Sequence, residues 1–185
     1  AIKAPGFGDR RKEMLSDIHE ASVRLIAIVN DFLDVASLEQ GNVGIKGVRC
    51  DIAEIIEHVL RNLKNSAEQK GLVLRLNKPA ILPQVFCDKG RTAQVIANLI
   101  GNAIKFSPRG IITVEVTLEP EKKALKIMVK DSGMGISPEQ QTLLFRKFQQ
   151  AGEQVLARDV TQGTGLGLYI SKLLVERMGG EIGLE

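Results

Sequence analysis

The stretch NLIGNAIKF, residues 98 to 106, predicts a helix whose two faces differ in chemistry. Its polar face carries Asn98, Asn102 and Lys105, which follow one another at steps of four and three residues. Asparagine is a poor helix former, so two asparagines inside one helix are locally unfavourable. The opposite arc of the predicted helix is apolar and carries Val95, Leu99, Ala103 and Phe106.

A polar helix face has two interpretations. It can simply be exposed to solvent, which is the common role of such residues. Conflicts between local propensity and context, however, tend to collect at functional sites. A carboxamide oxygen is also a suitable neutral ligand for a hard cation such as Mg²⁺. Asn102 and Asn98 are therefore candidates for a binding site.

The bulk composition limits the classes of protein. A chain of 185 residues holds one substantial domain and a small appendage. Its net charge of +3 comes from 25 basic and 22 acidic residues, a balance that indicates neither nucleic acid nor anionic membrane as the main partner. Cys50 and Cys87 show no metal-binding spacing and indicate reduced thiols. No apolar run approaches about 20 residues, so we expect a cytoplasmic piece, although its parent could be membrane-anchored.

The N-terminal region predicts a loop followed by a long helix. Residues 1–15 begin with a Gly- and Pro-rich stretch without a period. From Ser16, a possible N-cap, a heptad seam runs to about Leu38 and indicates a coiled-coil-like helix that needs a partner. QGNVG, residues 40–44, is the best candidate boundary. The seam residues are Ile18, Ser22, Leu25, Val29, Phe32 and Ala36.

The remaining pattern predicts an α+β protein. A helix starts at Asp51 with Glu54 completing a capping box, and it ends before Gly71. Its buried stripe is Ile52, Ile55, Ile56, Val59 and Leu63, with His58 off it. Further elements are strands at 72–77 and 84–88, a helix at 89–106, a hairpin of 111–118 with 124–131, and helices near 138–147 and 166–178. The expected fold is a two-layer α/β sandwich, a mixed sheet with helices on one face, preceded by the long helix.

Two glycine-rich stretches follow the hairpin. In DSGMGIS, residues 131–137, Gly133 and Gly135 let the backbone approach a flat ligand, and Asp131 can accept a hydrogen bond from an exocyclic amino group. A plain turn after a strand is the alternative. In GTGLGLYISKLLVERMGG, residues 163–180, glycines lead into a helix whose free N–H groups and dipole favour an anion. Residues 149–162 before it indicate either a mobile lid or an ordinary surface loop.

Taken in order, these stretches resemble the ATP-binding catalytic domain of sensor histidine kinases, which has the Bergerat fold of gyrase, Hsp90, histidine kinase and MutL. NLIGNAIKFSPRG is similar to its N box, DSGMGI to its first glycine box, LLFRKFQQA to its F box and GTGLGLYISKLLVERMGG to its second glycine box. Residues 16–41 resemble the second helix of the dimerisation hairpin. Four boxes in family order over residues 16–185 are far more specific than any single box.

The resemblance implies a role for each matching residue. Asp131 is expected to bind the adenine amino group in a pocket shaped by Gly133, Gly135 and Ile136. Asn102 is the expected Mg²⁺ ligand, and Asn98 and Lys105 are the expected catalytic residues that face the metal and phosphates. Two aromatic residues, Phe145 and Phe148, are expected to anchor the near end of the lid. The second glycine box is expected to contact the nucleotide through Gly163, Thr164, Gly165, Leu166, Gly167 and Leu168.

The resemblance also favours phosphoryl transfer over hydrolysis. In the ATPase members, the position one turn before the metal-binding asparagine is a glutamate that activates water. Here that position is Asn98, whose carboxamide cannot act as a base. Catalysis would then rest on positioning and charge neutralisation of ATP and Mg²⁺. The implied partners are ATP and, in the parent protein, a histidine-containing dimerisation domain and a response regulator.

Three parts of the chain depart from the family pattern. The acceptor histidine is absent, since neither His19 nor His58 lies in the expected motif and both are interpreted as structural. Residues 1–15 resemble a fragment of the bacterial 60-kDa chaperonin, from which we infer a non-native or fusion segment and no chaperonin activity. Residues 42–185 form the expected ATP-binding domain, which stops before a further family strand. Residues 16–41 therefore lack a hairpin partner, and self-association through 16–38 into a homodimer is expected.

Four functions remain in competition at this point. The first is a histidine kinase catalytic region that binds ATP·Mg²⁺ but cannot phosphorylate itself. The second is a non-catalytic, ATP-binding regulator. The third is a gyrase-type ATPase, against which Asn98 argues. The fourth, a purely structural coiled coil, is disfavoured by the four ordered boxes.

Overall fold

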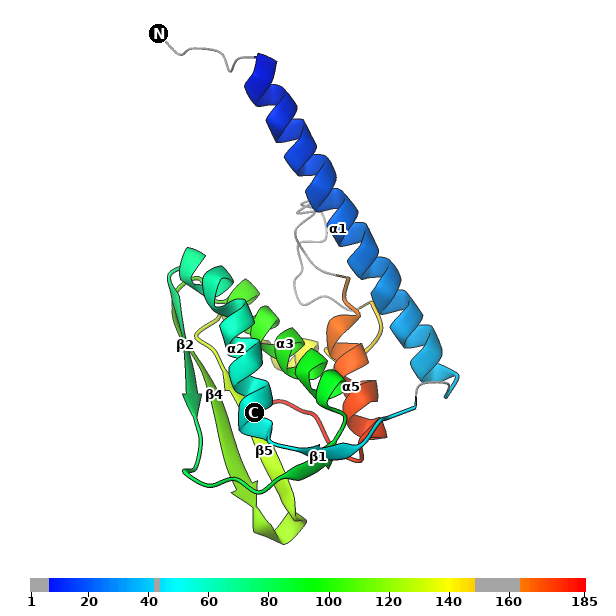
Figure 1. Ribbon diagram of the computed structural model, residues 1–185, viewed down its shortest axis with the longest axis vertical. Coiled ribbons are helices and arrows are strands. Elements are labelled where there is room, and N and C mark those ends of the chain that lie inside the picture. The colour runs from blue at the N-terminus through cyan, green and yellow to red at the C-terminus, as the bar shows by residue number, and fades with distance from the viewer. Residues whose placement is uncertain (1–6, 42–43, 149–163) are drawn as a thin grey trace.

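The C-terminal end of a long helix packs against a mixed α/β body in the computed structural model, which describes residues 7–41, 44–148 and 164–185. The rest of the helix extends beyond that body (Figure 1). The elements run in the order α1 (Phe7–Glu39), β1 (Val48–Cys50), α2 (Ile52–Gln69), β2 (Leu72–Asn77), β3 (Val85–Cys87), α3 (Lys89–Phe106), β4 (Gly110–Glu119), the 3₁₀ helix η1 (Pro120–Lys122), β5 (Ala124–Lys130), α4 (Pro138–Gln141) and α5 (Gly167–Arg177).

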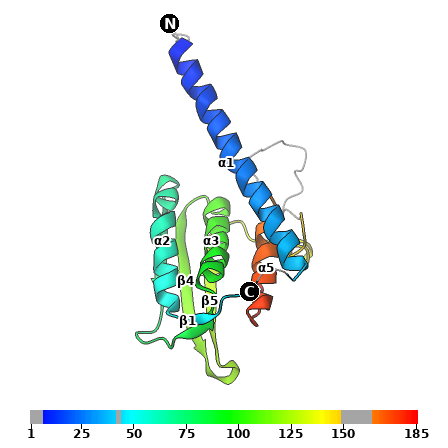
Figure 2. The ribbon, with the colours of Figure 1, turned by 45° about the vertical axis from the view of Figure 1, so that its right-hand side comes forward.

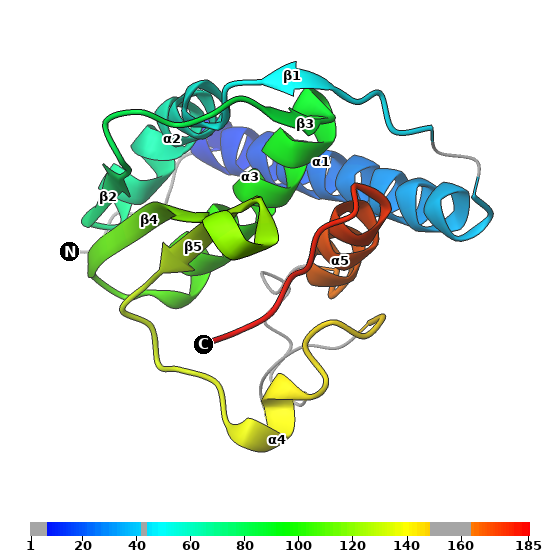
Figure 3. The ribbon, with the colours of Figure 1, turned by 90° about the horizontal axis from the view of Figure 1, so that it is seen from below.

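The main sheet is mixed, in the order β2-β4-β5. β2 runs parallel to β4, with Leu72 opposite Gly110, whereas β4 and β5 form the predicted antiparallel hairpin, with Thr113 opposite Lys130. A second, two-stranded sheet joins β1 to β3. Figure 3, seen from below, shows β2, β4 and β5 as one layer.

Helices α2 and α3 lie side by side over one face of this sheet (Figure 2). Strand β4 alternates, and its residues Ile112, Val114 and Val116 are buried against the helices. The helices contribute a matching set of isoleucines, which are Ile52, Ile55, Ile56, Ile96, Ile100 and Ile104. The expected two-layer sandwich with helices on one face is thereby confirmed, and its core is aliphatic.

A second core cluster joins α1 to α5. Val35 and Leu38 of α1 pack with Leu166, Ile170 and Leu174 of the α5 region. The phenol of Tyr169 donates a hydrogen bond of 2.7 Å to Glu39 at the end of α1. That bond, together with burial, raises the pKa of Tyr169 to about 12, because the carboxylate stabilises the protonated phenol. The C-terminal third of α1 is therefore part of the folded body.

Aspartate side chains start both sheet-covering helices. Asp51 caps α2 by accepting hydrogen bonds from the backbone N–H groups of Ala53 and Glu54. The Glu54 carboxylate pairs with Lys89 at 3.3 Å, across to the first turn of α3. Asp88 caps α3, and backbone hydrogen bonds, foremost from Arg91, lower its pKa. These contacts fix the start of α3 relative to α2, and they help to determine the direction in which the polar face of α3 points.

Several sequence-based expectations about the elements were wrong. α1 begins at Phe7, so Ser16 lies inside the helix and is not its N-cap. Strand β1 was not predicted, and α4 ends at Gln141 instead of near residue 147. The helix near 166–178, the strands and α3 agree with prediction within about two residues.

The two cysteines meet in space although they are far apart in sequence. Cys50 and Cys87 lie on the paired strands β1 and β3, and the Cys50 thiol donates to the Cys87 carbonyl oxygen at 3.6 Å. Both thiols are free, and burial raises the pKa of Cys50. Among residues 7–41, 44–148 and 164–185, no helix is long and apolar enough to cross a membrane.

Candidate functional site

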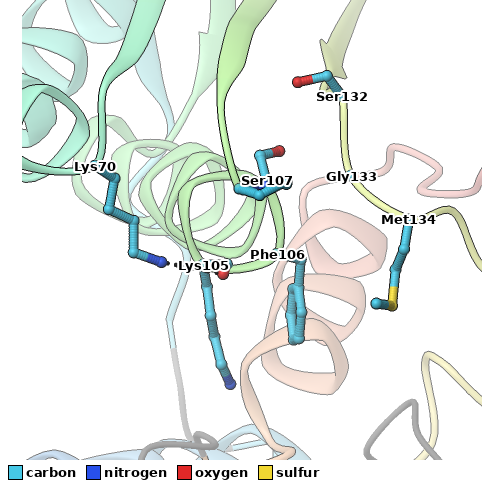
Figure 4. A pocket seen from close by; sticks show the side chains of 8 residues that line it. Lys70, Lys105, Phe106, Ser107, Ser132, Gly133 and Met134 are labelled. Atoms are coloured by element: carbon cyan, nitrogen blue, oxygen red, sulfur yellow. Dashed lines mark hydrogen bonds between the residues drawn. The ribbon is translucent and has the colours of Figure 1, made fainter.

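A cleft of about 570 Å³ opens between the C-terminal end of α3 and the loop that follows β5 (Figure 4). Of the residues that sequence reasoning assigned to a site, Lys105 and Gly133 line this cleft. The full lining is Lys70, Lys105, Phe106, Ser107, Pro108, Ser132, Gly133 and Met134.

The two asparagines of α3 have different surroundings. The Asn98 carboxamide donates a hydrogen bond of 2.9 Å to the buried hydroxyl of Ser171 on α5. It also lies against Gly167, where a Cβ atom would come within 2.4 Å of the Asn98 Oδ1 atom. Asn102 is half-buried, and within the described part of the chain its side chain makes no hydrogen bond. Asn98 thus joins α3 to the start of α5, whereas Asn102 is available to a ligand.

The end of α3 differs from expectation at Phe106. The sequence placed Phe106 on the apolar back of the helix, but its side chain is 48% exposed and lines the cleft. The buried arc is centred on Ile96, Ile100 and Ile104, so Phe106 falls outside it. The Lys105 ammonium lies 4.8 Å from the centre of the Phe106 ring. Burial, and then the nearby charge of Lys70, lower the pKa of Lys105.

The loop after β5 brings its carboxylate to the same region. Asp131 accepts a hydrogen bond of 2.7 Å from the backbone N–H of Gly133. A Cβ atom at Gly133 would lie 3.1 Å from the Phe106 carbonyl oxygen, so glycine allows the loop to touch the end of α3. Asn102 precedes Phe106 by four residues, about 6 Å along the helix axis. The loop that begins at Asp131 therefore touches α3 about one turn beyond Asn102.

Further along the loop, Gly135 has a positive φ of 74°, a conformation that favours glycine. Ile136 is exposed, and its carbonyl oxygen accepts a hydrogen bond of 2.9 Å from the Gln141 side chain on α4. Phe145 is half-buried. Phe148 is 65% exposed, and the lid that it was predicted to anchor lies outside the described residues.

The second glycine-rich stretch is described from Thr164 onward. Gly163 and the proposed lid, residues 149–162, lie outside the described residues. Thr164 donates a hydrogen bond of 2.8 Å to Asp31 of α1 and accepts one from the Leu166 N–H. The Leu166 side chain is buried in the α1–α5 cluster. Gly165 has a positive φ of 69°, and Gly167 and the half-buried Leu168 open α5.

Sequence reasoning missed two polar residues of the cleft. Lys70 lies at the end of α2, and its ammonium donates to the carbonyl oxygens of Ile104 and Lys105, each at 3.1 Å. Ser107 is 1% exposed, and its hydroxyl has no hydrogen-bond partner among the described residues. Neither position shows a local pattern, because each depends on elements that meet only in the folded chain.

The chemistry of this region suits a ligand with several kinds of group. Lys70 and Lys105 provide positive charge, and the Asp131 carboxylate provides a hydrogen-bond acceptor. The free carboxamide of Asn102 fits a hard cation, because Mg²⁺ binds through a few protein oxygens and completes its shell with phosphates and water. Among the described residues, no three His, Cys, Asp or Glu side chains gather as a metal site, so a cation here would depend on the ligand for most of its coordination.

Comparison with known proteins gives a consistent result. Residues 87–185 match the family model described as histidine kinase-, DNA gyrase B-, and HSP90-like ATPase. The chain is 38% identical over 178 residues to the non-motile and phage-resistance protein of Caulobacter vibrioides, covering 94% of this chain and 21% of that protein. It is 36% identical over 176 residues to the signal transduction histidine-protein kinase BarA of Escherichia coli, covering 93% and 19% respectively. The chain thus spans about a fifth of these relatives.

Among solved structures, the fold is similar to full-length ShkA in complex with AMPPNP. The TM-score is 0.79 at 26% sequence identity, and the match covers 98% of this chain and 38% of ShkA. The similarity includes α1, since almost the whole chain is covered.

Proposed function

The chain belongs to the family of histidine kinase-, DNA gyrase B-, and HSP90-like ATPases as a sensor histidine kinase catalytic region, and on this premise we propose the reaction that it performs. It transfers the γ-phosphoryl group of ATP·Mg²⁺ to a histidine on a dimerisation domain. His19 and His58 do not serve as that acceptor, since they lie exposed on α1 and α2 outside any phosphoacceptor motif.

One observation carries the choice of kinase over hydrolysing ATPase. Helix α3 contains no acidic residue, and its polar face presents Asn98, Asn102 and Lys105. Asn98 is moreover held by Ser171 at 2.9 Å, so nothing on α3 can remove a proton from water. Charge neutralisation and positioning of the phosphates remain as the means of catalysis.

The residues divide into three groups in this proposal. Asp131 accepts a hydrogen bond from the adenine amino group, in a pocket formed with Gly133, Gly135 and Ile136. Asn102 holds Mg²⁺, which supplies neutralisation of the phosphate charge, and Lys105 contacts the phosphates. The second glycine stretch provides backbone N–H groups at the start of α5, where the helix dipole favours anions, through Thr164, Gly165, Gly167 and Leu168.

The partners follow from the same proposal. The acceptor histidine belongs to a dimerisation domain, and the phosphoryl group passes on to a response regulator in the complete signalling system. Because the reaction consumes ATP, we place it in the cytoplasm. The near balance of charge, +3 overall, supports a protein partner over nucleic acid.

The test is phosphoryl transfer to a separately supplied acceptor domain. We expect radiolabel from γ-labelled ATP to appear on an acceptor that contains the phosphoacceptor histidine, and not on a matched acceptor in which glutamine replaces it. Without any acceptor, phosphate release should stay near the background rate. Binding of ATP without transfer would identify a regulator instead, and steady phosphate release without an acceptor would identify an ATPase.

Helix α1 supports a further part of the proposal, self-association through residues 16–38. The seam residues Ile18, Leu25, Val29 and Phe32 are large, apolar and exposed along one helix. We expect light scattering to give about twice the 20.2 kDa mass of the chain. Leu25→Glu together with Val29→Glu should give the monomer mass, while Leu33→Glu, outside the seam, should not. If the wild-type chain is monomeric at all accessible concentrations, self-association through residues 16–38 is refuted.

A further inference from the structure

We propose that Lys70 is a positioning residue of the cleft, which holds the last turn of α3 so that Lys105 can meet the phosphates of a bound nucleotide. This inference rests on the proposed function, because it assumes that a nucleotide occupies the cleft. Lys70 comes from the end of α2, more than thirty residues before Lys105, and belongs to none of the four motifs.

The end of α3 needs partners that the helix cannot supply. The last four carbonyl groups of a helix have no partner within it. In α3, the Ser107 N–H occupies the Ala103 carbonyl oxygen, which leaves those of Ile104, Lys105 and Phe106. The Lys70 ammonium donates to those of Ile104 and Lys105, each at 3.1 Å. The bond to Lys105 is drawn in Figure 4. A side chain from α2 thus completes the C-terminus of α3.

The backbone of Lys70 is itself well fixed. Its N–H closes α2 by donating to the carbonyl oxygens of Ala67 and Glu68, and Ala67 is buried in the main core. Gly71 follows with a positive φ of 69° and turns the chain directly into β2. The ammonium is therefore held from a rigid junction between helix and sheet, which makes it suitable for holding another element in place.

The position of Lys70 also solves an electrostatic problem. The C-terminus of a helix carries a partial negative charge, which would repel polyphosphate. The C-terminus of α3 lies at the cleft, and Lys70 places a positive charge on its free carbonyl oxygens. The positive charge of Lys70 therefore offsets the partial negative charge of this helix end.

No carboxylate competes for Lys70 among the described residues. Its ammonium makes no salt bridge there, whereas Lys64 on the same helix pairs with Glu68 at 3.7 Å and lies outside the cleft lining. Lys64 is thus a matched control, because Lys64→Met removes one positive charge from the same helix region as Lys70→Met but removes no contact to α3.

The test measures the Kd of a fluorescent ATP analogue and of adenosine for the whole chain. Lys70→Met should raise the Kd of the ATP analogue three- to fivefold and leave that of adenosine unchanged, since Lys105 acts on phosphates. Lys70→Arg keeps the charge and the hydrogen-bond donors, so its Kd for the ATP analogue should stay within twofold of the wild-type value. Lys64→Met should leave that Kd unchanged. An equal loss for adenosine, or the same loss in Lys64→Met, would overturn the proposal.

A double-mutant cycle decides whether Lys70 acts through Lys105. If it does, Lys70→Met should cause no further loss in the Lys105→Met background. If the losses of binding free energy in the two single variants add fully in the double variant, Lys70 and Lys105 act independently, which contradicts the proposal that Lys70 positions Lys105. Lys70→Ala, which also removes the donor, serves if Lys70→Met fails to fold, and an unchanged Kd in that variant again contradicts the proposal. Failure of the wild-type chain to bind the analogue would instead refute the proposed function.

Discussion

Replacing Asp131 with asparagine is expected to weaken binding of an ATP analogue at least tenfold, or about 1.4 kcal/mol. A carboxylate accepts a hydrogen bond from the adenine amino group, whereas the carboxamide NH₂ would set donor against donor. The Asp131 Oδ1 atom already accepts from the Gly133 N–H at 2.7 Å, a bond that the Asn oxygen can keep. The substitution should therefore preserve the loop and remove only the acceptor for the base.

The measurement is a titration with the fluorescent analogue, with and without Mg²⁺. Asp17→Asn, at an exposed position on α1, makes the same change of charge away from the cleft and should leave the Kd unchanged. In the same titration, Asn102→Ala should remove the gain in affinity from Mg²⁺ while leaving binding in its absence intact. If Asp131→Asn leaves the Kd unchanged, Asp131 does not recognise the adenine base, and that part of the proposal is wrong.

The parts of the fold that could be predicted are those whose signal is local. Helix α3 and the hairpin of β4 with β5 follow from apolar periodicities that the residues themselves display. Strand β1 has three residues and two exposed side chains, so its stability comes from pairing with β3, more than thirty residues later. Such a partner leaves no trace in the local sequence.

The start of α1 shows the opposite error. Gly6 and Gly8 suggested a loop, yet the helix begins at Phe7 and includes Gly8. Residues 10–15 are mostly good helix formers, and once a helix exists, adding a residue to its end costs far less than nucleating a turn. Propagation from residues 10–15 therefore overrides the weak propensity of one glycine.

The candidate site divides in the same way. Asn98, Asn102 and Asp131 could be found from sequence because their residue types are unusual at those points of a helix or loop. Lys70 and Phe106 could not, since their role depends on how α2 and α3 end beside each other. Asn98 shows the limit most clearly, because its bond to Ser171 crosses to a helix 73 positions later in the chain.

Helix α1 contacts the proposed phosphate end of the site through polar groups as well. Thr164, at the beginning of the described part of the second glycine stretch, donates to Asp31 of α1 at 2.8 Å. The guanidinium of Arg91 on α3 pairs with Asp34 at 3.1 Å. The helix that carries the proposed dimer seam is thus connected to both helices, α3 and α5, that carry residues of the proposed nucleotide site. Its attachment to α5 should therefore be important for the stability of the whole region.

Leu38→Ala should accordingly lower the free energy of unfolding by about 2–5 kcal/mol, the usual cost of emptying a core leucine site. Leu38 is 1% exposed and packs with the α5 residues Ile170 and Leu174, in a cluster separate from the main core. The cavity would lie in the cluster that α1 and α5 form together with Val95 of α3. Urea denaturation followed by circular dichroism measures the change.

Leu33→Ala is the matched control, because the same atoms are removed from a 56% exposed position five residues earlier on the same helix and outside the predicted seam. Its cost should stay within about 0.5 kcal/mol. Hydrogen exchange in Leu38→Ala should then show faster exchange in α5 than in β4, since β4 belongs to the other cluster. Equal losses in the two variants would mean that α1 does not depend on this contact. In that case the polar contacts of α1, such as those of Asp31, Asp34 and Glu39, would have to attach the helix instead.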